Sequence, residues 1–293
     1  MLFLKRPHAH AHDEPDHDDH GGLHRDLGAT MDRRGMLRLA ARFGVVLGAA
    51  QLAACAADGI ADVGSTDMGT GSGSGGGNGT GTSGAACAAK IPEETAGPYP
   101  GDGSNGPNVL TQSGVVRQDI RTSFAGLSGT ATGVLLDLEL TIVSASTCSP
   151  LAGYAVYLWH CDRAGNYSLY SSGATSQNWL RGVQAADANG KVRFTTSFPG
   201  CYAGRWPHIH FEVYESLTAA TAVRNKIATS QIALPKTACD AVYATSSYSS
   251  SVSNFSRITL ASDNVFSDGA SLELATVTGD VTSGMTATLT VGI

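Results

Sequence analysis

The sequence is poor in charge and contains no long apolar run. Only 15% of its 293 residues are Asp, Glu, Lys or Arg, and the net charge is −6. Up to Ala54, seven basic residues balance seven acidic ones, so the negative charge belongs to the rest of the chain. The lack of basic charge argues against a nucleic-acid binder. No apolar run reaches the roughly 18–20 residues that a permanent membrane-spanning helix needs, so we expect no such helix.

The first part of the chain has the layout of an export signal. Arg33 and Arg34 precede an apolar run over 43–54, which is typical of twin-arginine signals. The run ends in a Leu-Ala-Ala-Cys tetrad that closes at Cys55 and resembles a bacterial lipobox, in which the cysteine becomes the lipidated first residue. We therefore predict a signal over 31–55 and a periplasmic or cell-surface lipoprotein. An amphipathic helix with two chance arginines is the alternative.

Two flanking segments are too polar or too simple to form a core. Residues 1–30 carry six of the nine histidines among aspartates, a composition that can bind metal loosely. This segment precedes the signal, and Met31 is an alternative start, so we assign it no function. Residues 56–86 are rich in Gly, Ser and Thr and predict a flexible tether with a span of roughly 30 Å. The remaining residues, 87–293, suffice for one well-buried domain.

The domain is predicted to be all-β. Between 134 and 143 apolar residues occupy every second position, which indicates a strand with one buried face. Similar short runs, separated by Gly, Pro, Asn and Ser, favour an antiparallel sandwich or barrel. Helices should be few, short and confined to connections, around 177–183 or 238–244. The predicted strands are 134–143, 154–159, 191–196, 208–214, 229–234 and 286–291.

Two histidines and two tyrosines are the candidate metal ligands. His208 and His210 alternate along a predicted strand, so both imidazoles lie on one face. Apart from His160 they are the only histidines beyond residue 30. Tyr202 lies six residues before this strand, and Tyr167 follows a predicted strand in a Gly-Asn-Tyr-Ser turn. A His-x-His pair also occurs on ordinary surface strands, and either tyrosine alone is explained by packing.

Together these motifs resemble the iron-binding core of the intradiol ring-cleavage dioxygenases, the catechol and protocatechuate enzymes. The resemblance runs from about Ile91 to the end of the chain. It implies a β-sandwich with a mononuclear non-haem Fe(III) centre held by Tyr167, Tyr202, His208 and His210. The motifs are Glu94-Thr95-Ala96-Gly97-Pro98-Tyr99, Trp159-His160 with Gly165 and Tyr167-Ser168, Pro199-Gly200 with Tyr202, and Arg205 with Pro207-His208 and His210.

The chemistry of this ligand set agrees with the resemblance. A phenol with an ordinary pKa of about 10 must lose its proton to bind a metal, and two phenolates reduce the +3 charge of ferric iron to about +1. A catechol can chelate such an ion through both hydroxyls, with the metal as Lewis acid and template. By resemblance, Tyr202 leaves the metal and accepts a proton as substrate binds, opposite His210, while Tyr167 and His208 are equatorial. O2 then opens the ring between its two hydroxylated carbons to a muconate-type dicarboxylate.

The resemblance also assigns roles near the metal. Arg205 matches the arginine that stabilises negative charge on the substrate ring in that family. Gln231 resembles a polar residue of the same pocket. The alternative for Arg205 is an ordinary surface arginine. Tyr99 and Trp206 are candidates for lining the pocket, which packing explains equally well. The segment from Tyr202 to His208 is shorter than in the catechol enzymes. Their helical dimerisation segment has no counterpart before Ile91, so that route to a dimer is not expected and the oligomer stays open.

The cysteines beyond Cys55 are odd in number, five, in a chain expected to enter an oxidising compartment. One is therefore unpaired or pairs between chains. Cys161 and Cys201 each lie close in sequence to a predicted iron ligand, so we predict a bridge between them. Two buried thiols are the alternative.

Two other functions remain open at this stage. An exported β-sandwich on a flexible stalk is also typical of a binding module, in which the metal site would be degenerate. A zinc or copper site built on His208 and His210 alone is a further possibility. Colour distinguishes them, because two tyrosinates on Fe(III) absorb visible light.

Overall fold

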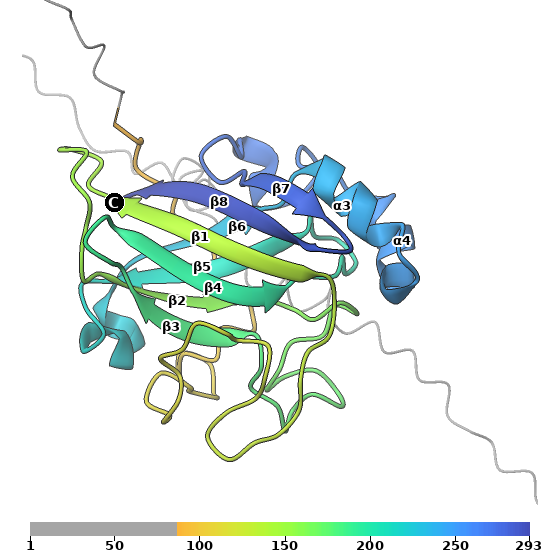
Figure 1. The fold of residues 1–293 in the computed structure, drawn as a ribbon, viewed down its shortest axis with the longest axis horizontal. Coiled ribbons are helices and arrows are strands. Elements are labelled where there is room, and N and C mark those ends of the chain that lie inside the picture. The colour runs from red at the N-terminus through yellow and green to blue at the C-terminus, as the bar shows by residue number, and fades with distance from the viewer. Residues whose placement is uncertain (1–86) are drawn as a thin grey trace, which may run out of the picture. The chain divides into compact units, whose positions relative to one another are not determined.

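The computed structural model describes residues 87–293. The predicted signal with Cys55, the histidine-rich segment and the tether lie outside these residues. The described part forms two four-stranded sheets (Figure 1). The all-β sandwich predicted from the sequence is confirmed. No helix in this part is long and apolar enough to cross a membrane.

The first sheet has the strand order β4-β1-β8-β7. Its strands are β4 (Lys191–Ser197), β1 (Leu135–Val143), β8 (Gly284–Gly292) and β7 (Thr276–Asp280). β1 pairs antiparallel with β4 but parallel with β8, so this sheet is mixed and not wholly antiparallel. The parallel pair brings the last strand of the domain beside its first.

The second sheet has the order β3-β2-β5-β6 and is antiparallel throughout. Its strands are β3 (Arg181–Ala185), β2 (Ala155–Trp159), β5 (His208–Tyr214) and β6 (Lys226–Ala233). All residues of β2 and β5 are buried on both faces. A strand of this kind must lie between two layers, so the outer face of this sheet is covered as well.

Two apolar clusters account for this burial. The main core lies between the sheets and receives the alternate leucines of β1 together with Ile209, Phe211 and Val213 of β5. On the other side of the second sheet, Tyr157, Trp159 and Tyr214 join a smaller cluster with side chains from the covering loops. Because successive strand residues face opposite ways, the even-numbered residues of β5 point toward these loops.

Six of the eight strands coincide with the predicted ones. β3 was missed because it is short and contains Gly182, where an added Cβ would lie 2.5 Å from Cγ2 of Ile120. β7 was missed because it is mostly exposed. The helix predicted around 238–244 overlaps α3 (Lys236–Tyr243), and α4 (Ser249–Phe255) follows it. The helix predicted around 177–183 is wrong, since β3 begins there.

The predicted Cys161–Cys201 bridge is also wrong. The disulfide joins Cys87 to Cys148, and Cys161, Cys201 and Cys239 are buried free thiols. Cys161 belongs to the smaller cluster and Cys201 to the main core, so the two side chains pack in different clusters. The observed bridge ties the start of the domain to the loop that follows β1.

Candidate metal centre

Four side-chain atoms from three segments converge over the second sheet. His208 and His210 stand on β5, Tyr167 comes from the loop after β2, and Tyr202 from the loop after β4. The Nε2 atoms of the histidines are 3.1 Å apart, and the Tyr167 hydroxyl lies 3.5 and 3.2 Å from them. The Tyr202 hydroxyl is 3.2 Å from Nε2 of His208 and 3.4 Å from the Tyr167 hydroxyl.

These spacings and donor types fit a bound metal ion. Bonds of about 2.0–2.2 Å place four tetrahedral donors about 3.3–3.6 Å apart, close to the observed separations. Within residues 87–293 no group of three or more His, Cys, Asp or Glu side chains could hold a metal ion. A site here therefore depends on the two tyrosines. Tyr167, His208 and His210 are buried, whereas Tyr202 is half-buried and is the donor nearest to solvent.

The histidine rings are held in place by their surroundings. Nδ1 of His208 lies 2.5 Å from the carbonyl oxygen of Trp206, which leaves Nε2 as the atom that faces the other donors. The ring of His210 stacks on Trp159 with centroids 5.0 Å apart and planes 4° from parallel. Gly97 also lies close to this ring: its φ is +66°, and a Cβ added there would lie 3.3 Å from Cε1 of His210.

Burial keeps the two histidines and Tyr167 uncharged in the absence of a bound cation. Burial, followed by the charge of Arg205, holds the pKa of His208 well below its usual value, and burial followed by His208 does so for His210. Both imidazoles are therefore available as metal ligands at neutral pH. Burial and then the neighbouring Tyr202 raise the pKa of Tyr167 well above 10. A bound cation must displace this proton, which couples metal binding to proton release.

Arg205 is a buried member of a continuous hydrogen-bonded chain. Its Nε lies 3.0 Å from Oδ2 of Asp263, and its Nη2 donates to Oε1 of Gln231 at 2.7 Å. Gln231 stands opposite His210 on β6, and its Nε2 donates to the carbonyl oxygen of Thr95 at 2.8 Å. The surface-arginine alternative is therefore wrong. Nη1 has no hydrogen-bond partner among residues 87–293, so it is the nitrogen of this guanidinium that is still available as a donor.

Two residues of this neighbourhood escaped sequence reasoning. Asp263 is fully buried and also accepts hydrogen bonds from the backbone N–H groups of Trp206, Val265 and Phe266. It lies far from the other site residues in the sequence, in the segment between α4 and β7, and no pattern marks it. Trp159 was noted only as part of a motif; its position directly opposite His210 in the β2–β5 register explains the stacking.

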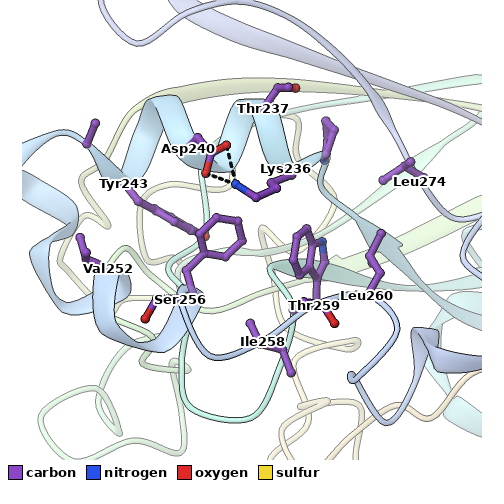
Figure 2. A pocket seen from close by; sticks show the side chains of 14 residues that line it. Lys236, Thr237, Asp240, Tyr243, Val252, Ser256, Ile258, Thr259, Leu260 and Leu274 are labelled. Atoms are coloured by element: carbon purple, nitrogen blue, oxygen red, sulfur yellow. Dashed lines mark hydrogen bonds and ion pairs between the residues drawn. The ribbon is translucent and has the colours of Figure 1, made fainter.

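The structure separates the two candidate pocket residues. Tyr99 packs on Tyr167, with ring centroids 4.9 Å apart, and so lies beside the donors. Trp206 is placed differently: its indole packs on Phe255 and lines an apolar groove of about 830 Å³. Figure 2 shows this groove, whose walls include Tyr243 of α3 and Val252 of α4. None of the four donors lines that groove. Trp206 is therefore not a wall of the space next to the donors.

Comparison with known proteins shows which dioxygenases the domain is similar to. A family model described as Dioxygenase matches residues 105–229, which include all four donors and Arg205. The structure of an intradiol ring-cleavage dioxygenase from Tetranychus urticae is 25% identical, covering 71% of this chain and 94% of its own, with a TM-score of 0.55. A second dioxygenase structure is 26% identical with the same coverage and a TM-score of 0.56. No curated protein matches significantly. The family match and these structures support an intradiol ring-cleavage dioxygenase, in agreement with the motifs of the sequence.

Proposed function

We propose that this protein is a non-haem Fe(III) dioxygenase that cleaves a catecholic ring between its two hydroxylated carbons, using O2, to a muconate-type dicarboxylate. The observation that carries the proposal is the convergence of two phenol and two imidazole groups within 3.1–3.5 Å. Phenolate oxygen suits a hard trivalent cation better than zinc or copper(I). Bound there, ferric iron would act as Lewis acid and template for a chelated catechol.

The surrounding side chains would bind the substrate and manage its protons. Tyr202 is half-buried, so its hydroxyl can reach an incoming catechol and accept a proton from it. Arg205 can direct Nη1 to the negative charge that develops on the ring, while Asp263 and Gln231 hold the guanidinium still. Tyr99 provides an aromatic wall beside Tyr167. Titration with substituted catechols tests which ring substituents this pocket accepts.

Metal analysis and a visible spectrum of the purified protein test the proposal directly. We expect iron at about one per chain and a tyrosinate-to-iron absorption band that shifts when catechol is added, followed by O2 uptake. His208→Ala and His210→Ala should lose the iron and the colour. His160→Gln is the matched control, because His160 is equally buried but binds Thr196 and the Cys161 carbonyl.

The competing functions make different predictions in the same experiment. A binding module with a degenerate site would be colourless and free of iron. A zinc or copper protein would contain that metal and lack tyrosinate absorption. A colourless or zinc-loaded protein that takes up no O2 with catechol would overturn the proposed function.

We further propose that the enzyme is exported and tethered to a membrane through a lipid on Cys55. The lipobox-like tetrad and the paired arginines support this, and they lie outside the described residues. A single acyl chain anchors a protein only marginally, so stable attachment requires more than one chain on the first residue. Cys55→Ala should move the protein from the membrane fraction to the soluble fraction. Membrane retention of the variant would instead favour an uncleaved signal helix.

A further inference from the structure

Arg181 is a buried cation without a carboxylate partner. Its side chain is 1% exposed, and no ion pair among residues 87–293 includes it. It makes five hydrogen bonds to neutral oxygens. Nε donates to Oγ of Ser168 at 3.0 Å, Nη1 to the Pro100 carbonyl at 2.7 Å and the Tyr157 hydroxyl at 3.1 Å, and Nη2 to the carbonyls of Tyr99 and Ser168 at 2.9 Å.

A buried guanidinium bonded only to neutral oxygens lowers the stability of the fold. Removing a charge from water is unfavourable, and a residue of similar size without charge would avoid that cost. The planar guanidinium is the side chain that can hold several oxygens in fixed directions at once. The bonds of Arg181 therefore point to a requirement that its acceptors be held at fixed positions relative to one another.

Apart from the Tyr157 hydroxyl on β2, the acceptors belong to two segments that meet at the donors. We call residues 94–100 the strap. Its Gly97 lies against His210, and the ring of its Tyr99 lies against Tyr167. Gln231 holds the strap at the Thr95 carbonyl, and Arg181 holds its other end at Tyr99 and Pro100. The second segment contains Ser168, the residue directly after the donor Tyr167.

Backbone strain flanks both of the residues that form this connection. Leu169, next to Ser168, has a φ of 73°, and Leu180, next to Arg181, has a φ of 56°. Leucine rarely adopts the left-handed region, so each of these residues stores backbone strain. Gly101 follows the strap with a φ of +64°, and a Cβ there would lie 2.8 Å from Nη1 of Arg181. The local chain is thus shaped around the guanidinium.

We infer that Arg181 is a positioning residue that fixes the strap against the donor Tyr167 and thereby sets the space available to the ring of the substrate. The inference rests on the proposed function for the identity of that substrate. Tyr99 is the wall that Arg181 places, since the guanidinium binds its carbonyl while its ring packs on Tyr167.

Arg181→Lys tests this inference, with Arg117→Lys as the matched control. Arg117 also binds backbone carbonyls, those of Ile120, Thr122 and Arg181, but touches neither the strap nor the donors. In the metal-free proteins, hydrogen exchange of a peptide covering 91–103 should speed up at least about tenfold in Arg181→Lys relative to the rest of the domain. In Arg117→Lys the strap should exchange as in the wild type.

Catechol kinetics provide the second measurement. Arg181→Lys should raise KM about tenfold with a smaller change in kcat, because a loosened wall weakens binding more than it changes the reacting groups. If Arg181→Lys fails to fold, Tyr157→Phe replaces it: this change removes the hydroxyl that donates to Pro100 at 2.7 Å and leaves the ring in place. Unchanged strap exchange and unchanged KM would overturn the inference even in an active enzyme. A wild type that lacks iron would overturn the proposed function, while the exchange measurement would still decide whether Arg181 holds the strap.

Discussion

Replacement of Arg205 should affect stability and catalysis separately, because the residue is half of a buried ion pair. In Arg205→Leu the carboxylate of Asp263 loses its charged partner at a site that is 0% exposed. Breaking a buried pair on one side typically costs about 3–5 kcal/mol. Three backbone N–H groups continue to bond Asp263, so we expect the lower end, about 3 kcal/mol.

The assay is urea unfolding followed by tryptophan fluorescence, on Arg205→Leu, Asp263→Asn and the double variant. Removing the charge of Asp263 should relieve the penalty left by Arg205→Leu. The double variant should therefore be at least about 1 kcal/mol more stable than the sum of the single changes predicts. A free energy of unfolding for Arg205→Leu within about 0.5 kcal/mol of wild type would refute the buried-pair reasoning.

The same residue has a distinct catalytic prediction, measured under conditions in which every variant is folded. Arg205→Leu should retain iron and bind catechol, while kcat falls on the order of 10²-fold. Arg205→Lys keeps a charge near Asp263 but loses the planar guanidinium that also binds Gln231. Its kcat should therefore lie between those of the wild type and Arg205→Leu. Normal turnover by the Leu variant would limit Arg205 to a structural role, and loss of iron would make it a support of the ligand strand.

Three further outcomes are expected. Tyr202→Phe should keep the fold and lose most of the ring cleavage, since it removes one hydroxyl of a half-buried side chain; wild-type rates of O2 uptake would contradict its role. Burial and the charge of Glu94 raise the pKa of Glu273 from 4.5 to about 8, so the folded protein retains a proton that the unfolded chain releases. Stability should therefore fall by up to about 1.4 kcal/mol per pH unit between about pH 4.5 and 8, and Glu273→Gln should flatten this profile in thermal melts; equal slopes would exclude the effect. Removing the Cys87–Cys148 bridge, which closes a separation of 61 residues, should cost about 2–4 kcal/mol in chemical unfolding without changing the visible spectrum.

The local sequence pattern was sufficient to predict the strands whose apolar residues alternate regularly along the chain. The alternation in β1 and the two-residue spacing of His208 and His210 each follow from strand geometry, so the strands and the shared face of the imidazoles were predictable. β3 carries no such alternation. It pairs with β2 and accommodates Gly182 against Ile120, a contact set by tertiary packing.

Pairings between distant residues were not predictable from one sequence. Asp263 meets Arg205 across 58 positions, and nothing in its neighbourhood indicates a buried acid. The predicted disulfide pairing was wrong for a related reason. Cys161 and Cys201 each lie near a predicted ligand along the chain, but their side chains belong to different apolar clusters. Both thiols are buried and unpaired.

If the proposed lipid on Cys55 holds the protein by its leading end, the bridge between Cys87 and Cys148 has a mechanical consequence. Tension applied to the chain ahead of Cys87 passes through the disulfide to the loop after β1 and is borne by that sheet. The backbone from Ile91 onward, which is pinned by its N–H to the carbonyl of Gly292 before it reaches the strap, carries little of this load. The covering over the donors is thereby shielded from pulling forces, and reduction of the bridge would expose it to them.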